Sequence, residues 1–135
     1  MSEASDVIVA EVPFVSVLIA ARNEASEIGT CIECFKHQRY PKDRFEVIII
    51  NDQSTDATSD IIKEQIKSAS INLRQLFTSG AGGKKEAIYE GLLNAKGSII
   101  LTTDADCRVP ETWIADFTEK FKATGAYFIT GPVML

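Results

Sequence analysis

Two aspartates separated by one residue carry the sharpest chemistry in this sequence. Asp104 and Asp106 follow the apolar run SIILTT, which predicts a buried strand over Ser98–Thr103. Residues i and i+2 of an extended segment point the same way, so both carboxylates can face one site. Such hard oxygen ligands suit Mg²⁺ or Mn²⁺, with the remaining positions left to water and a diphosphate. Taken alone, Asp-x-Asp is also a common surface turn, and here it could cap the helix predicted at Pro110.

Another carboxylate, Asp52, follows three consecutive isoleucines at the end of a strand predicted over Phe45–Ile50. A carboxylate at that position can accept hydrogen bonds from a nucleobase or a ribose. The alternative is a turn residue, with Ser54, Thr55 or Asp56 capping the next helix. Capping through Asp56 or Ser54 accounts for part of this segment, but it explains Asp52 less well.

Glycines and lysines between Gly80 and Lys85 stand where a third helix is predicted to begin. Backbone N–H groups and the helix dipole make such an end receptive to phosphate. The segment is not a P-loop, because Lys85 stands where Ser or Thr is required and an earlier glycine is missing. A dinucleotide fingerprint would instead follow the first strand. Alone, the turn is a weak signal that also fits a flexible connection with solvated lysines.

The cysteines favour packing over chemistry. Cys31 and Cys34 form a Cys-x-x-Cys pair with His37 three residues further on, but Cys31 lies on the apolar face of a predicted helix. Because no second ligand pair appears, helix packing is favoured over a redox or zinc site. Three cysteines do not make a disulfide framework. Cys107, beside the aspartates, is expected to line the site without acting.

Alternating strands and helices must position these residues. Short apolar runs predict strands over Phe14–Ala20, Phe45–Ile50, Ile71–Phe77 (nearer an edge), Ser98–Thr103 and Tyr127–Thr130. Helical spacing predicts helices over Glu24–Lys36 and Asp56–Lys67, from the turn Ser79–Gly83 through Ala95, and from Pro110 to about Lys122. This order predicts an α/β fold with a mostly parallel sheet and helices on both faces. Polar residues after four of the strands should converge where such sheets bind ligands, beyond the carboxyl ends.

Length and composition predict a single domain. The chain has 135 residues, of which 45% are hydrophobic and 24% charged. Residues 1–13 are expected to be a lead-in that is disordered at its start. The net charge of -5 argues against a nucleic-acid partner, which would need a basic face. No apolar run reaches the ~18 residues of a membrane span, and no signal-peptide pattern opens the chain, so a cytoplasmic location is expected.

Four segments, in order and in register, resemble the family 2 inverting glycosyltransferases of GT-A fold. They are VSVLIAARNE, FEVIIINDQSTDAT, GGKKEAIYEG and GSIILTTDADCRVPETWI, and the resemblance runs from about Val15 to Pro132. It implies that residues 1–135 form a partial family 2 domain. That part is the Rossmann-like, nucleotide-sugar-binding half of the GT-A fold, truncated before the part that completes catalysis.

The resemblance also implies roles for particular residues. The implied nucleotide-binding residues are Ala20, Arg22, Glu24, Asp52, Lys84 and Asp104. Among them, Asp52 is implied to contact the base, usually uracil. Asp104 is implied to face ribose or metal, and Asp106 to be the metal ligand. Asn51 stands where many relatives have a second aspartate, a mild departure from the pattern.

By the same resemblance, the expected activity is inverting transfer of a sugar to a saccharide or lipid acceptor. The sugar donor is expected to be a UDP-sugar, with Mg²⁺ or Mn²⁺ neutralising the departing diphosphate. The family's general base and its Gln-x-x-Arg-Trp segment would lie beyond Leu135, so this fragment is expected to bind the sugar donor with little transfer. Relatives with these motifs often continue into membrane helices, and we therefore expect a membrane-associated parent with this domain in the cytosol. Uncovered apolar surface near Val133–Leu135 is expected to make the fragment self-associate.

Three other classes remain as alternatives. A nucleotidyltransferase would show a glycine-rich basic loop after its first strand, where ARNEASE has no glycine. A phospho-receiver module would need a phosphorylatable aspartate after the third strand, which instead ends in Thr78 and Ser79. A non-catalytic module that senses nucleotide sugars stays open, because the distinguishing residues would lie beyond Leu135.

Overall fold

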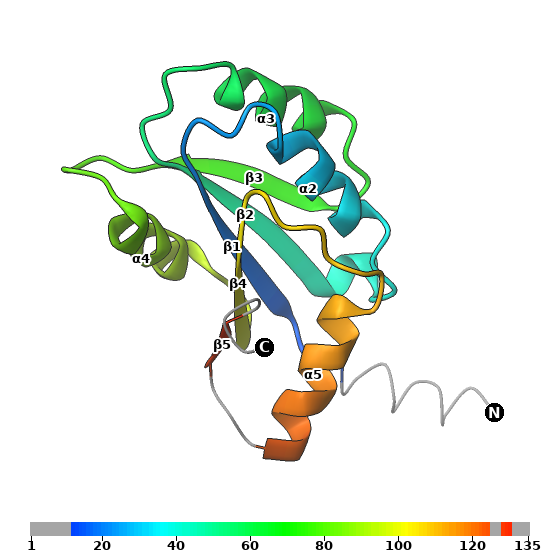
Figure 1. Cartoon of the computed structure of the whole chain (residues 1–135). Helices are drawn as coiled ribbons and strands as arrows, with labels where there is room; N and C mark the ends of the chain where they lie inside the picture. Colours follow the sequence, from blue (N-terminus) through cyan, green and yellow to red (C-terminus); the bar gives the residue numbers. More distant parts are fainter. Residues whose placement is uncertain (1–11, 125–127, 131–135) are drawn as a thin grey trace.

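Five parallel strands form the central sheet of the computed structural model, which describes residues 12–124 and 128–130 (Figure 1). The strands are β1 (Val15–Ala21), β2 (Phe45–Asn51), β3 (Asn72–Phe77), β4 (Ile99–Asp104) and β5 (Phe128–Thr130). Their order is β3-β2-β1-β4-β5, and every pairing is parallel. The helices are α2 (Ile28–Lys36), α3 (Thr58–Lys67), α4 (Lys84–Asn94) and α5 (Trp113–Thr124), with a 3-10 turn η1 (Lys42–Arg44). The predicted α/β class and the edge position of β3 are confirmed.

Helices cover both faces of the sheet, as the alternation predicted. On β1, Val17 and Ile19 point into a core built with α2, α3 and α5, whereas Leu18 points to the opposite face and packs with α4. This follows from the two-residue period of a strand, which sends successive side chains to opposite faces. Both faces of β1 are therefore buried, and Figure 1 shows α4 on the other side of the sheet from α2 and α3.

Two helices begin later than the sequence predicted. The helix predicted from Glu24 starts at Ile28, because the intervening backbone forms turns that are bonded to the neighbouring β2–α3 loop. The helix predicted from Pro110 starts at Trp113, after a turn in which Trp113 N donates to Pro110 O at 3.1 Å. The other boundaries agree within two residues, and Tyr127 lies outside the described residues.

The packing predicted for Cys31 is confirmed. Cys31 is fully buried in the core, and burial raises the pKa of its thiol to about 12. A neutral thiol in this position behaves as a small apolar side chain. Trp113 of α5 makes edge contacts with Phe35 of α2 and with Phe117, at centroid distances of 5.7 and 5.4 Å. These contacts attach α5 to the α2 side of the sheet.

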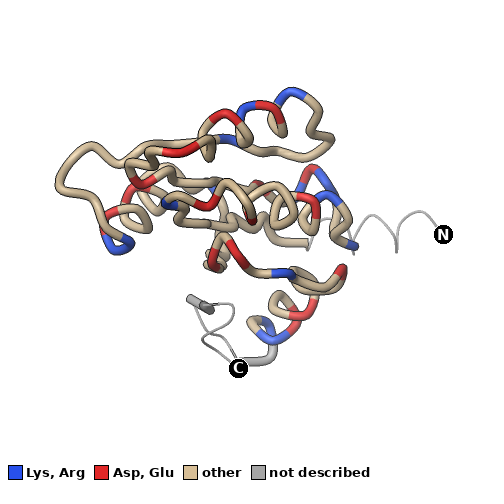
Figure 2. The backbone as a smooth tube through the Cα atoms, turned by 45° about the horizontal axis from the view of Figure 1, so that its top comes forward, with Lys and Arg blue, Asp and Glu red and all other residues tan. Residues whose placement is uncertain are grey.

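Charged residues of both signs are interspersed along the described chain (Figure 2). Within residues 12–124 and 128–130, no helix has the length and apolar character that a bilayer crossing requires. Large apolar side chains are also exposed, namely Tyr89, Leu92 and Leu93 of α4 and Phe77 at the end of β3. The residues near Val133–Leu135, to which the sequence attached self-association, lie outside the described residues.

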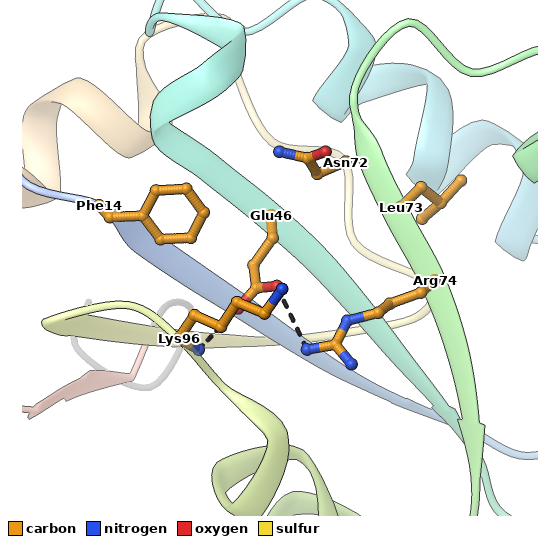
Figure 3. Close-up of a pocket in the computed structure, with 6 residues that line it drawn as sticks. All are labelled: Phe14, Glu46, Asn72, Leu73, Arg74 and Lys96. Carbon is orange, nitrogen blue, oxygen red and sulfur yellow. Dashed lines mark hydrogen bonds and ion pairs between the residues drawn. The ribbon is translucent and has the colours of Figure 1, made fainter.

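At the amino ends of the strands, a buried carboxylate ties four segments together. Glu46 is 4% exposed and accepts hydrogen bonds from Ser16 Oγ of β1 at 2.7 Å, Lys96 N at 2.9 Å and Arg74 Nη2 of β3 at 3.3 Å. Figure 3 shows Glu46, Arg74 and Lys96 in a small pocket that Phe14 also lines. Because each oxygen of Glu46 has a partner, the burial of its charge is compensated.

Gly97 lies so close to the start of β1 that a larger residue at this position should destabilise the fold. A Cβ at Gly97 would lie 2.6 Å from Ser16 N and 2.8 Å from Phe14 O, which are backbone atoms that cannot move aside. We expect Gly97→Ala to lower the free energy of unfolding by roughly 1 to 3 kcal/mol, as overpacking does. Chemical denaturation measures this. The control is Gly29→Ala in α2, where a Cβ would meet only side-chain atoms at 3.8 Å or more. Equal stability of the two variants would contradict the prediction.

Candidate functional site

The carboxyl ends of β1, β2 and β4 enclose a pocket of about 360 Å³. Its lining consists of Ala20, Ala21, Arg22, Glu24, Asp52, Lys84, Asp104, Ala105 and Asp106. The structure thus brings together all seven residues that the sequence assigned to a nucleotide or a cation. A pocket of this size lies within the range of small-molecule sites.

Strand register sets the two sides of this pocket level with each other. Ala20 of β1 pairs with Asp104 of β4, and Ala21 pairs with Asn51 of β2. Asp52 N then donates to Ala21 O at 2.8 Å, extending the pairing by one residue. The order of strands reverses at β1, with β2 on one side and β4 on the other. Open α/β sheets bind ligands at such a switch point.

Asp104 and Asp106 form a cluster that can hold a cation. One carboxylate oxygen of each and Cys107 Sγ all lie within 4.8 Å of one another. Asp104 is partly exposed and Asp106 is exposed, so water and a ligand can complete a coordination shell around an ion held there. This donor set fits Mg²⁺ or Mn²⁺, which take carboxylate oxygens and keep several waters. The thiol of Cys107 is a third group within reach, although the sequence gave it no role.

Lys84 occupies one side of the same cluster. Its Nζ lies 2.5 Å from Asp104 Oδ1, and the two side chains are 66% and 47% exposed. Lys84 is the first residue of α4, and Gly83 precedes it with a φ of 105°. An ion pair this exposed contributes little to stability, about 0 to 1 kcal/mol. The contact is therefore easily exchanged for contacts with a ligand.

The pocket carries an excess of negative charge. Its lining has four carboxylates and two cationic side chains, Arg22 and Lys84. The pKa of Glu24 is raised, first by burial and then by the negative charges of Asp106, Glu27 and Asp104. Burial is the largest cause of this shift, and the neighbouring negative charges that add to it would also attract a cation.

Asp52 is committed to the protein itself. It is 4% exposed, and its two carboxylate oxygens accept the Gly83 N–H at 3.0 and 2.9 Å. Thr78 Oγ1 donates a further hydrogen bond to Asp52 Oδ1 at 3.1 Å. The sequence predicted a carboxylate directed at a nucleobase. The structure shows that the same group fastens the loop that leads into α4.

Asn23 joins the loop that follows β1 to the loop that follows β2. Its Oδ1 accepts hydrogen bonds from Thr55 N at 2.7 Å and Asp56 N at 3.3 Å, and its own N–H donates to Ser54 Oγ at 2.9 Å. A φ of 52° turns its backbone into the left-handed region, which asparagine tolerates better than most residues. These bonds hold Arg22 and Glu24 in place, and no pattern in the sequence signalled them.

Helix capping at α3 differs in detail from the sequence prediction. Ala57 takes the cap position and has no side-chain cap bond. Asp56, one residue earlier, accepts hydrogen bonds from Thr58 N at 3.0 Å and from Thr58 Oγ1 at 2.5 Å. These bonds lower the pKa of Asp56. Ser54 does not cap, because its Oγ receives the N–H of Asn23.

Fold and pocket together define a Rossmann-like α/β domain with an acidic pocket at the switch point of its sheet. The sequence profile of glycosyl transferase family 2 matches residues 16–135, and the chain belongs to that family. Over 121 residues it is 32% identical to the glycosyltransferase AglE of Haloferax volcanii, an alignment that covers 90% of this chain and 40% of AglE.

Two solved structures have the same fold. The mannosyltransferase PcManGT from Pyrobaculum calidifontis, in complex with GDP-Man and Mn²⁺, aligns with a TM-score of 0.77 at 28% identity, over 81% of this chain and 32% of that chain. S. aureus TarS 1-349 in complex with UDP aligns with a TM-score of 0.69 at 25% identity, over 83% of this chain and 33% of that chain. The chain therefore spans less than half the length of the relatives it matches.

Removing the Asn23 side chain should loosen the pocket wall. Asn23→Ala deletes the acceptor for two N–H groups and places alanine at a positive φ, so we expect the free energy of unfolding to fall by about 1 to 3 kcal/mol. Denaturant unfolding measures the change. Asn23→Asp is the control, because it keeps a side-chain oxygen and should retain most of the stability. If both variants lose the same stability, the amide oxygen is not the group that joins the loops.

Proposed function

We propose that this chain is the sugar-donor-binding part of a metal-dependent glycosyltransferase. The parent transfers a sugar with inversion from a UDP-sugar to a saccharide or lipid acceptor. The observation that carries the proposal is the carboxylate pair Asp104 and Asp106 at the switch point of the sheet, in a pocket with negative excess.

The charge of the pocket is the physical argument for a metal. A diphosphate is an anion, and four carboxylates around it would repel it more than two cationic side chains attract it. Mg²⁺ or Mn²⁺ held by Asp106 and Asp104 would cancel that negative excess and would supply Lewis-acid stabilisation of the leaving diphosphate. In this proposal, a cation is needed for binding as well as for transfer.

The chain's own side chains would orient the sugar donor around that cation. Lys84 and Arg22 are the two cationic groups of the lining and would contact the phosphates. Backbone groups of Ala20, together with Glu24, would border the nucleoside. Asp52 would receive a hydrogen bond from the base, which requires it to share oxygens that the Gly83 N–H now occupies.

Similar proteins support the class of ligand. PcManGT was solved with GDP-Man and Mn²⁺, and TarS with UDP. The two differ in their base, so the fold accepts either, and uridine is our proposal for this chain. We also propose that the general base for the acceptor lies outside these 135 residues, that the isolated chain binds without robust transfer, and that it can self-associate. The parent is proposed to be membrane-associated with this domain in the cytoplasm.

Binding of UDP should depend on both the metal and Asp106. We expect calorimetric titration of UDP into the chain to show binding with Mn²⁺ and at least tenfold weaker binding without it, because a lost charge-assisted contact costs about 1.5 to 3 kcal/mol. Asp106→Asn should remove the metal-dependent part.

Asp60→Asn provides the matched control, since it also removes one negative charge, but in the first turn of α3. It should bind like the wild type. Metal-independent binding, or equal losses in the two variants, would rule out the assignment of Asp106. A parallel titration with GDP tests the proposed preference for uridine.

Lys84 should oppose the binding of a free cation and favour the binding of a nucleotide. Because its ammonium pairs with Asp104, we expect Lys84→Met to raise the affinity for Mn²⁺ alone by about twofold to fivefold, the value of an exposed ion pair. The same variant should bind UDP with Mn²⁺ more weakly. Electron paramagnetic resonance of free Mn²⁺ measures the first effect and calorimetry the second. Lys85→Met is the control, and a change of equal size there would point to a general charge effect.

A further inference from the structure

Glu86, outside the pocket, holds the loop that delivers Lys84 to it. Gly80 N donates to Glu86 Oε2 at 2.7 Å, and Gly82 N donates to Glu86 Oε1 at 3.0 Å. Each oxygen of the carboxylate thus takes one backbone N–H of the loop between β3 and α4. We propose that Glu86 is a positioning residue for the sugar-donor site and acts through Lys84, an inference that rests on the proposed function.

The loop is fastened from two sides, and Glu86 is one of them. On the other side, Asp52 accepts the Gly83 N–H and Gln53 Nε2 donates to Gly80 O at 2.9 Å. Gly82 and Gly83 have φ values of 87° and 105°, which glycine adopts without strain. A loop this rich in glycine would be mobile without such bonds. The two carboxylates therefore determine its shape.

The backbone of the loop before α4 must be fixed if Lys84 is to be held at the sugar-donor site. The pair of Lys84 and Asp104 is exposed, and an ion pair in water is too weak to order a flexible loop by itself. The carboxylate of Glu86 accepts two backbone N–H groups of the loop, and hydrogen bonds to a charged group are stronger than an exposed ion pair. The position of the ammonium group is therefore a consequence of the bonds to Glu86 and Asp52 and not their cause.

The role of Glu86 differs from that of an ordinary helix cap. It is the third residue of α4, where a glutamate usually reaches back to the N–H of the cap residue. Here Asp52 takes the N–H of the cap residue Gly83, and Glu86 takes the N–H groups of Gly82 and Gly80. The hydrogen bonds from Gly80 and Gly82 lower the pKa of Glu86, so its carboxylate stays charged around neutral pH. It is not part of the pocket lining, so it acts on a ligand only through the loop.

A double-mutant cycle between Glu86 and Lys84 tests the proposal. Glu86→Gln keeps the shape but leaves a single acceptor oxygen, and Glu90→Gln, one turn along α4, is the matched control. With Mn²⁺ present, we expect Glu86→Gln to weaken UDP binding about threefold to tenfold, as the loss of one such hydrogen bond implies. In the Lys84→Met background, Glu86→Gln should have no further effect. Equal weakening in both backgrounds would show a merely structural role and overturn the proposal.

A second measurement does not depend on any ligand. In the free protein, hydrogen exchange at Gly83 N should accelerate in Glu86→Gln and not in Glu90→Gln, although Gly83 N is bonded to Asp52 and not to Glu86. Unchanged exchange would overturn the proposal whatever UDP does. If exchange accelerates and the wild type fails to bind UDP with Mn²⁺, the positioning of the loop stands and the proposed function fails.

Discussion

The parallel pairing of β1 with β4 is the constraint on which the pocket depends. These two strands are far apart in the sequence, yet their register sets Ala20 level with Asp104. Since parallel strands end at the same edge of a sheet, the connections that follow β1, β2 and β4 start beside the pocket. The helices bury both faces of the sheet. This burial fixes the register, because a slip of one residue would move every side chain to the opposite face.

Carboxylates do two different kinds of work around this edge. Asp104 and Asp106 are accessible and gather charge for a ligand. Asp52, Asp56 and Glu86 instead accept backbone N–H groups and hold the loops in shape. The two uses are compatible because hydrogen bonds from N–H groups stabilise a carboxylate in its charged form, whereas an exposed carboxylate keeps its oxygens accessible to a ligand.

Much of the fold and of the candidate site could be predicted from the sequence alone. Apolar runs and helical spacing located the elements within a few residues, because hydrophobic periodicity reflects which face is buried. Ligands bind at the carboxyl ends of parallel strands, and this rule identified the polar residues after each strand, above all Asp104 and Asp106, as candidates for the site. Resemblance named the family, which the comparison over residues 16–135 shows. Cys31 was also correctly placed in the core, since it lies on the apolar face of its helix.

The sequence could not predict the hydrogen bonds that hold the loops together. These bonds join specific atoms of residues about thirty positions apart, such as Asn23 with Thr55 and Asp52 with Gly83. The late start of α2 has the same origin, since bonds to a neighbouring loop outweigh a weak local preference for helix. Local pattern determined which residues reach the pocket. Only the tertiary structure decided which carboxylates remain available there and which are used to hold the loops.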